Sequence, residues 1–176
     1  MTTTTRGIEL DRLSLQDALD LAVLIEQEAE ERYAELTDQM LAHHTEEAAG
    51  FFRFMAANEK KHGSELSARR QELFGDAPRA VGRAMIFDVE APDYDEARAF
   101  MSPREALLVA MRSEQKAHAF FVAALPHVTD AGVRALFEEL RQEEIHHQDL
   151  ITRELAKLPE GEGLPGDAFE DEPVAM

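Results

Sequence analysis

The chain has 176 residues and carries 18 lysines and arginines against 36 aspartates and glutamates, a formal net charge of −18. This charge argues against binding to nucleic-acid phosphates or to an anionic membrane. Because cysteine is absent, disulfides, thiol catalysis and cysteine-ligated metal centres are excluded. The sequence has neither an apolar run of the roughly 18 residues that span a membrane nor a signal peptide at its start, so we expect a cytoplasmic protein.

Two segments in the first half have apolar residues at the three- and four-residue spacing typical of amphipathic helices. The first begins at the N-cap Ser14, with Asp17 as its capping-box partner, and runs to about Ala42. The second extends from Thr45 to about residue 74, where Gly75 provides a C-terminal cap. The short connection between them predicts an antiparallel hairpin.

Two further helices are predicted in the second half. The third has the clearest start, with Ser102 as N-cap, Pro103 at the first helical position and Glu105 at the third, and it stops at Pro126. The fourth extends over residues 130–158. These two helices also have a short connection, which predicts a second hairpin.

The remaining segments complete the predicted organisation. Residues 1–13 form an N-terminal lead, residues 75–101 a long crossover within the folded unit 14–158, and residues 159–176 an acidic flexible tail. No segment shows strand-like alternation. We therefore predict an all-α protein, a ferritin-like four-helix bundle in which two antiparallel hairpins are joined by the crossover.

The two predicted hairpins repeat one another. In the second and fourth helices, Phe52-x-x-Met55-x-x-x-Glu59-x-x-His62 is matched in residue type 85 positions later by Phe137-x-x-Leu140-x-x-x-Glu144-x-x-His147. The first and third helices align at an offset of 88, which pairs Glu26 with Glu114. The hairpins are pseudo-duplicates.

Each apolar stripe is interrupted by side chains that bind metals. The interrupting residues are Glu26, Glu59, His62, Glu114, Glu144 and His147. Four buried carboxylates would repel one another and lose hydration, whereas two divalent cations would neutralise them. Oxygen-rich ligation with one imidazole per metal suits iron or manganese, with zinc as a competitor. Two Glu-x-x-His pairs and two further glutamates on four helices are the known pattern of di-iron carboxylate bundles.

Two points of this interpretation have alternatives. The pair Glu143 and His146 has the same spacing one residue out of register, but only Glu144 and His147 align with the first repeat. The alternative to a metal centre is that the six interrupting residues are polar core residues whose side chains are satisfied by hydrogen bonds. Tyr33 could donate a hydrogen bond to a ligand carboxylate, making the two metals inequivalent because its counterpart is Phe121, or it could serve only core packing.

These motifs over residues 14–158 resemble the rubrerythrin branch of the ferritin-like superfamily. The resemblance implies two iron ions, with manganese or zinc as substitutes, at a centre that reduces hydrogen peroxide. It also implies that Glu59 and Glu144 bridge the metals. Glu26 with His62, and Glu114 with His147, would be the terminal ligands, with their distribution between the two metals left open.

Two departures from the family affect the expected reaction. A rubredoxin domain is absent, so electrons would come from an external donor protein, and Ala117 stands where rubrerythrins have an extra carboxylate. We expect an oxidoreductase that reduces peroxide or oxygen; the alternatives are a ferroxidase that oxidises Fe(II) for storage or detoxification, and a non-enzymatic bundle with a structural metal. A homodimer or higher homo-oligomer is expected from the superfamily.

Overall fold

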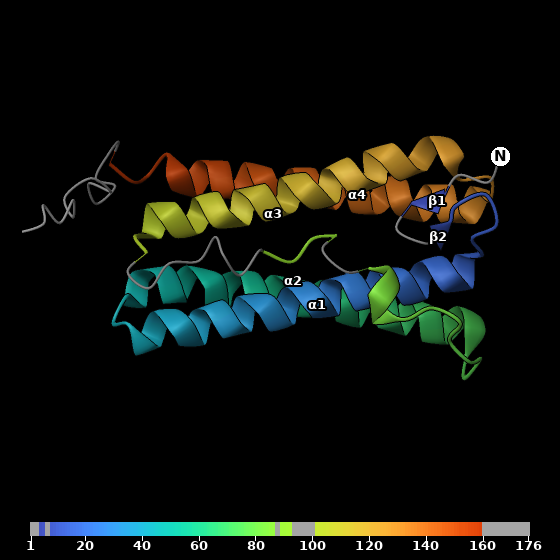
Figure 1. Cartoon of the computed structure of the whole chain (residues 1–176), viewed down its shortest axis with the longest axis horizontal. Helices are drawn as coiled ribbons and strands as arrows, with labels where there is room; N and C mark the ends of the chain where they lie inside the picture. The colour runs from blue at the N-terminus through green and yellow to red at the C-terminus, as the bar shows by residue number, and fades with distance from the viewer. Residues whose placement is uncertain (1–3, 6–7, 87–88, 93–100, 160–176) are drawn as a thin grey trace, which may run out of the picture.

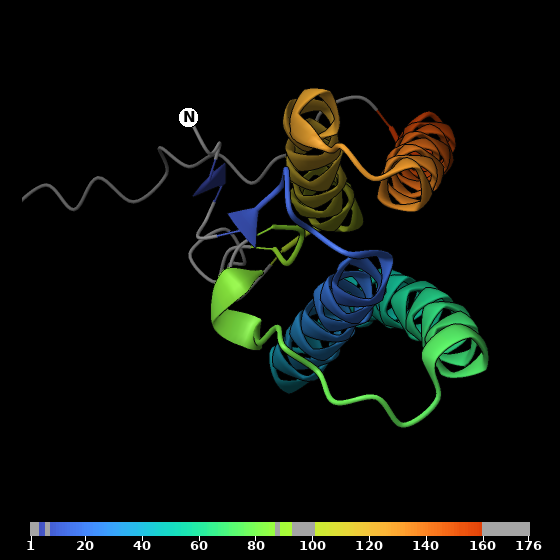
Figure 2. The ribbon, with the colours of Figure 1, turned by 90° about the vertical axis from the view of Figure 1, so that its right-hand side faces the viewer.

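Four long helices dominate the computed structural model, which describes residues 4–5, 8–86, 89–92 and 101–159. The helices are α1 (Leu15–Ala42), α2 (Glu46–Phe74), α3 (Pro103–Ala124) and α4 (Ala131–Leu155). α1 pairs with α2 and α3 pairs with α4, and the two hairpins lie against each other as two layers (Figure 1, Figure 2). The prediction of an all-α four-helix bundle is confirmed. In the described part of the chain, no helix is long and apolar enough to cross a membrane.

The helices begin and end where local side-chain chemistry directs them. Ser102 and Glu105 form the complete capping box at the start of α3. The hydroxyl of Ser14 accepts a hydrogen bond from the backbone N–H of Asp17 at 3.1 Å, as predicted. The Asp17 carboxylate accepts a hydrogen bond from this hydroxyl, whereas in a capping box it would accept one from the backbone N–H of Ser14. Gly75 ends α2 with a φ of 54°, which favours glycine.

Some boundaries differ from the sequence prediction. α3 is followed by a 3-10 turn, η3 (Leu125–His127), which accommodates Pro126 without a sharp stop. α4 ends at Leu155, three residues before the predicted end at Leu158, and the chain turns at residues 156–157. Two-residue strands β1 (Thr4–Thr5) and β2 (Ile8–Glu9) pair antiparallel in the N-terminal lead, although no strand was predicted. Strands this short carry no detectable alternation. Residues 160–176 of the predicted tail lie outside the described residues.

The apolar core forms two clusters at different heights along the bundle. One contains Leu19 and Phe121 together with Ile8 and Leu10 of the N-terminal lead. The other surrounds the fully buried Met55 and includes Tyr33 and Ile151. The candidate ligands belong to neither cluster.

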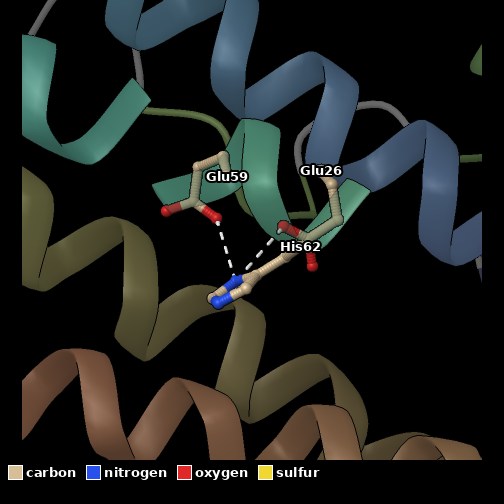
Figure 3. Close-up of side chains that lie close together, drawn as sticks. All are labelled: Glu26, Glu59 and His62. Atoms are coloured by element: carbon tan, nitrogen blue, oxygen red, sulfur yellow. Dashed lines mark ion pairs between the residues drawn. The ribbon is translucent and has the colours of Figure 1, made fainter. Parts of the chain in front are cut away.

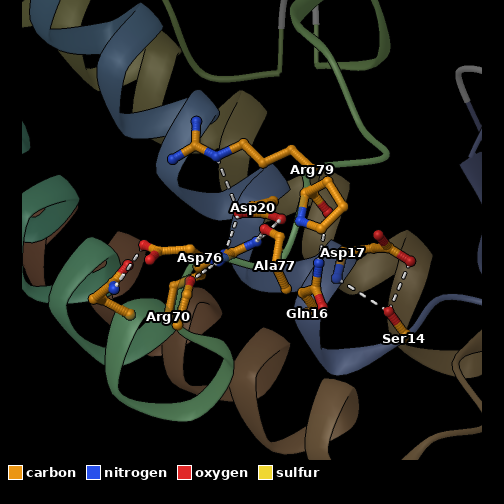
Figure 4. Close-up of polar contacts among 11 residues, drawn as sticks. Ser14, Gln16, Asp17, Asp20, Arg70, Asp76, Ala77 and Arg79 are labelled. Carbon is orange, nitrogen blue, oxygen red and sulfur yellow. Dashed lines mark hydrogen bonds and ion pairs between the residues drawn. The ribbon is translucent and has the colours of Figure 1, made fainter.

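A buried ion pair fixes the start of the crossover. Asp20 of α1 is fully buried and accepts hydrogen bonds from Arg70 of α2 at 2.8 Å and 3.2 Å, while Arg79 approaches to 3.3 Å (Figure 4). Arg70 also donates to the carbonyl of Ala77 at 2.6 Å. The guanidinium therefore ties the chain leaving α2 to α1. The crossover then forms a 3-10 turn, η1 (Arg83–Met85).

Candidate metal centre

Most candidate ligands from the helices are deeply buried in one polar layer of the bundle. Glu59 and Glu114 are fully buried, Glu26 and Glu144 are nearly so, and the side chain of His147 is 11% exposed. The side chain of His62 is more accessible, at 17%. Their oxygen and nitrogen atoms gather into overlapping groups whose members lie within 4.8 Å of one another, a separation at which a metal ion can be held.

The first group joins α1 to α2 and consists of Glu26, Glu59 and His62. The Nδ1 atom of His62 lies 3.9 Å from a carboxylate oxygen of Glu26 and 3.9 Å from one of Glu59 (Figure 3). The Glu-x-x-His spacing places Glu59 and His62 on one face of α2, and the antiparallel pairing brings Glu26 opposite them. Three donors of two chemical types therefore converge.

A glycine allows α1 and α2 to approach closely at this point. A Cβ atom on Gly63, the residue after His62, would lie 3.3 Å from the Cβ of Glu26. Such a contact is tighter than ordinary van der Waals packing, so an alanine would push Glu26 away. The lack of a side chain at Gly63 thus permits the close spacing of α1 and α2 beside Glu26.

The second group joins α2 to the other hairpin and consists of Glu59, Glu114 and His147. The Nδ1 atom of His147 lies 2.8 Å from Glu114 and 4.0 Å from Glu59. Tyr33 of α1 donates its hydroxyl to the other oxygen of Glu114 at 3.0 Å. Both oxygens of Glu114 are therefore engaged, and the sequence-based expectation of a Tyr33 bond to a ligand carboxylate matches this contact.

The two groups are adjacent. Glu59 belongs to both, and the imidazole rings of His62 and His147 stack at 5.0 Å with planes 7° apart. Glu144 groups with Glu114 instead of with the first group. The arrangement thus brings all six predicted residues together, with Glu59 the carboxylate common to both histidines. The out-of-register residues Glu143 and His146 lie in none of the groups found among the described residues.

A seventh residue, Glu90, was missed by the sequence analysis. It lies in the crossover, is 1% exposed, and forms the third group with Glu114 and Glu144. Helical periodicity cannot detect it, because it lies in no helix and has no counterpart in the repeat. The available signal was the pattern of Met85, Ile86 and Val89, whose apolar side chains indicate that this stretch of crossover is buried.

Burial changes the protonation of the centre. It is the main cause that raises the pKa values of Glu26, Glu59, Glu90 and Glu144 well above the ordinary 4.5, and neighbouring carboxylates raise them further. Burial also lowers the pKa of His62. For His147, burial favours the neutral ring, but the hydrogen bond and charge of Glu114 outweigh it and raise the pKa.

Several of these buried polar atoms have no hydrogen-bond partner. They are Oε2 of Glu26, both carboxylate oxygens of Glu59 and Glu90, Oε2 of Glu144 and Nδ1 of His62. Unpartnered buried oxygens on this scale cost folding free energy, which bound cations would offset. The donor set of carboxylates and two imidazoles therefore fits a pair of iron or manganese ions.

Comparisons with known proteins agree with this geometry. The family model for rubrerythrin matches residues 17–157. A solved structure of an uncharacterised conserved protein from Magnetospirillum magnetotacticum MS-1 is similar, with a TM-score of 0.65, 28% identity, and coverage of 86% of this chain and 99% of that chain. No curated protein matches the chain significantly. The fold is ferritin-like, and the chain belongs to the rubrerythrin family.

Proposed function

We propose that the chain is a di-iron oxidoreductase that reduces hydrogen peroxide or oxygen. The observation that carries this proposal is the buried layer in which the oxygens of Glu26, Glu59 and Glu144 lack hydrogen-bond partners beside two stacked histidines. Glu26, Glu59 and His62 would hold one ion, and Glu59, Glu114 and His147 would hold the other, with Glu144 contributing through its group with Glu114. Two iron ions that each change by one electron supply the two electrons needed to reduce peroxide to water.

The residues around the centre support an orienting role. Tyr33 and His147 fix Glu114 from opposite sides, which holds its oxygens in place before a metal binds. The apolar clusters on both sides limit water in the layer. Because the chain contains no cysteine-ligated iron, the electrons would come from a separate donor protein.

A pocket offers a route to this layer. It has a volume of about 100 Å³ and lies between α2 and α4, where it is lined by His62, Glu65, Leu66, Arg69, Glu139 and Glu143. Such a volume admits peroxide or oxygen next to the imidazole of His62. We therefore propose entry of the small substrate on the side of the first group.

The same pocket favours a second candidate function, the oxidation of Fe(II) for storage or detoxification. Three of the residues lining it are glutamates, and one of these, Glu139, is paired with Arg69 at 2.8 Å. An acidic entrance raises the local concentration of cations. In this case Fe(II) would itself be the substrate, and the centre would turn over repeatedly.

An anaerobic Fe(II) titration followed by separate exposure to peroxide and to oxygen tests the proposal. We expect saturation at about two irons per chain and faster oxidation by peroxide than by oxygen, seen in near-ultraviolet absorbance. Oxygen oxidation that continues beyond two irons per chain would favour the ferroxidase. Binding without redox change would indicate a structural metal, and the absence of stoichiometric binding would contradict the di-iron proposal.

Two neighbouring variants provide a matched control. Glu144→Ala removes a grouped carboxylate and is expected to abolish stoichiometric iron binding while the helices remain. Glu143→Ala removes the adjacent glutamate, which lines the pocket but lies outside the groups, and is expected to bind two irons per chain as the wild type does. The reverse result would show that the register assigned to α4 is wrong.

A further inference from the structure

The crossover enters the bundle between the two hairpins. Residues 89–92 are buried and lie between α1 and α3, as both ribbon views show (Figure 1, Figure 2). A segment that only linked α2 to α3 could follow the surface, where its backbone would be hydrated. Its burial at the level of the polar layer therefore needs a reason.

Three side chains hold this short segment in place. Consecutive carbonyls accept hydrogen bonds from both hairpins: Glu90 from Ser113, Ala91 from Lys116 at 2.9 Å, and Pro92 from Arg32 at 2.6 Å. Ser113 and Lys116 belong to α3, whereas Arg32 belongs to α1. The backbone at Glu90 is thus fixed relative to both hairpins, and its side chain has a defined position in the layer.

The carboxylate of Glu90 has no protein partner that would explain its burial. Neither oxygen has a hydrogen-bond partner in the part of the chain that the structure describes. One of its oxygens instead lies within 4.8 Å of oxygens of Glu114 and Glu144, and the nearby carboxylate of Glu59 also raises the pKa of Glu90. Three carboxylates converging in a buried space are unfavourable unless a cation lies among them.

We propose that Glu90 is a metal ligand delivered by the crossover to the position that Glu114 and Glu144 share. This inference rests on the proposed metal centre and adds a fifth carboxylate to it. Five carboxylates and two divalent cations leave one negative charge, whereas replacing one cation by a trivalent ion makes the site neutral. Glu90 therefore favours the trivalent state at its own position and makes the two metal positions inequivalent.

Calorimetric titration of the full chain with Mn(II) tests this assignment. We expect wild type to bind two ions and Glu90→Gln to lose affinity at one position by about 10- to 100-fold, with the other unchanged. Glu154→Gln removes the same charge from a residue of α4 that lies outside the groups and does not line the pocket, and it is expected to retain both affinities. Equal titrations of wild type and Glu90→Gln, or equal losses in both variants, would overturn the assignment.

Hydrogen exchange separates ligation from a packing role. Mn(II) should slow amide exchange at residues 89–91 in wild type but not in Glu90→Gln, while still slowing it around Glu59 in both. Equal protection of the crossover in both proteins would overturn the ligand role. If wild type binds no Mn(II), both this inference and the proposed function fail; if it binds two ions and Glu90→Gln matches it, only this inference fails.

Discussion

The two hairpins repeat one another in sequence but hold their halves of the centre differently. In the second half, Glu114 is fixed by Tyr33 at 3.0 Å and by His147 at 2.8 Å. In the first half, Oε2 of Glu26 and Nδ1 of His62 have no hydrogen-bond partner, and His62 lines the pocket. The duplicated pattern of candidate ligands thus has one half held by hydrogen bonds and one half that borders a pocket. We expect the second position to bind metal more tightly and the first to exchange it faster.

Removing the residue common to both halves should have the largest effect. Glu59 groups with His62 and with His147, so Glu59→Gln is expected to weaken Mn(II) binding at both positions by at least about 100-fold. Because the substitution removes a buried carboxylate without hydrogen-bond partners, the chelated protein should melt at the same or a higher temperature. Calorimetry and thermal unfolding measure the two effects; loss of only one position would show that Glu59 is not shared.

The pH dependence of stability should follow from the raised carboxyl pKa values. The buried carboxyl groups bind protons more tightly in the folded chain than in the unfolded chain, and this tighter binding stabilises the fold. The stabilisation is complete below pH 4.5, the ordinary pKa, and is lost as the pH rises through the raised pKa values of the folded chain. With a chelator present, the melting temperature is therefore expected to fall by about 5 °C or more between pH 5 and pH 8. Glu26→Gln should flatten this fall, and a chelated wild type whose melting temperature rises over the interval would contradict it.

Substitution of Tyr33 should make the halves more alike. Tyr33→Phe removes the hydrogen bond to Glu114 and recreates the residue type found at Phe121, so the two Mn(II) affinities should approach each other. The lost bond to a buried carboxylate should also lower the free energy of unfolding by about 1–3 kcal/mol in urea titrations. If the affinities remain as far apart as in wild type, Tyr33 serves core packing only.

The smallest expected effect is at the close contact of α1 with α2. Gly63→Ala places a methyl group 3.3 Å from the Cβ of Glu26 and should weaken the first metal position by less than about 10-fold, leaving the second unchanged. Gly50→Ala is the control in the same helix, since its Cβ meets no atom within 4 Å. It should raise stability by up to about 1 kcal/mol without affecting metal binding. If both variants bind metal with the same affinities, the close contact at Gly63 does not affect the first metal position.

Helical patterns carried most of the predictable information. Ser102 with Pro103 and Glu105 located the start of α3 because caps depend on neighbouring residues only. The internal repeat selected Glu144 over Glu143, and the side chain of Glu144 is the one grouped in the buried layer. Repetition and helical period together therefore identified six residues of the layer.

What the sequence did not reveal depends on contacts between distant segments. Glu90 lies outside any periodic element and reaches the layer through bonds from Ser113, Lys116 and Arg32, which no local pattern records. The grouping of Glu144 with Glu114 depends on the relative placement of two helices. Irregular segments that insert into a bundle are thus the main source of missed site residues.

Anomalous X-ray diffraction from crystals of the full chain grown with Mn(II) tests the central claim most directly. We expect two anomalous peaks in the buried layer, one contacting Glu26, Glu59 and His62 and the other contacting Glu114 and His147. A single peak, or peaks confined to surface carboxylates, would contradict a two-metal centre shared between the hairpins.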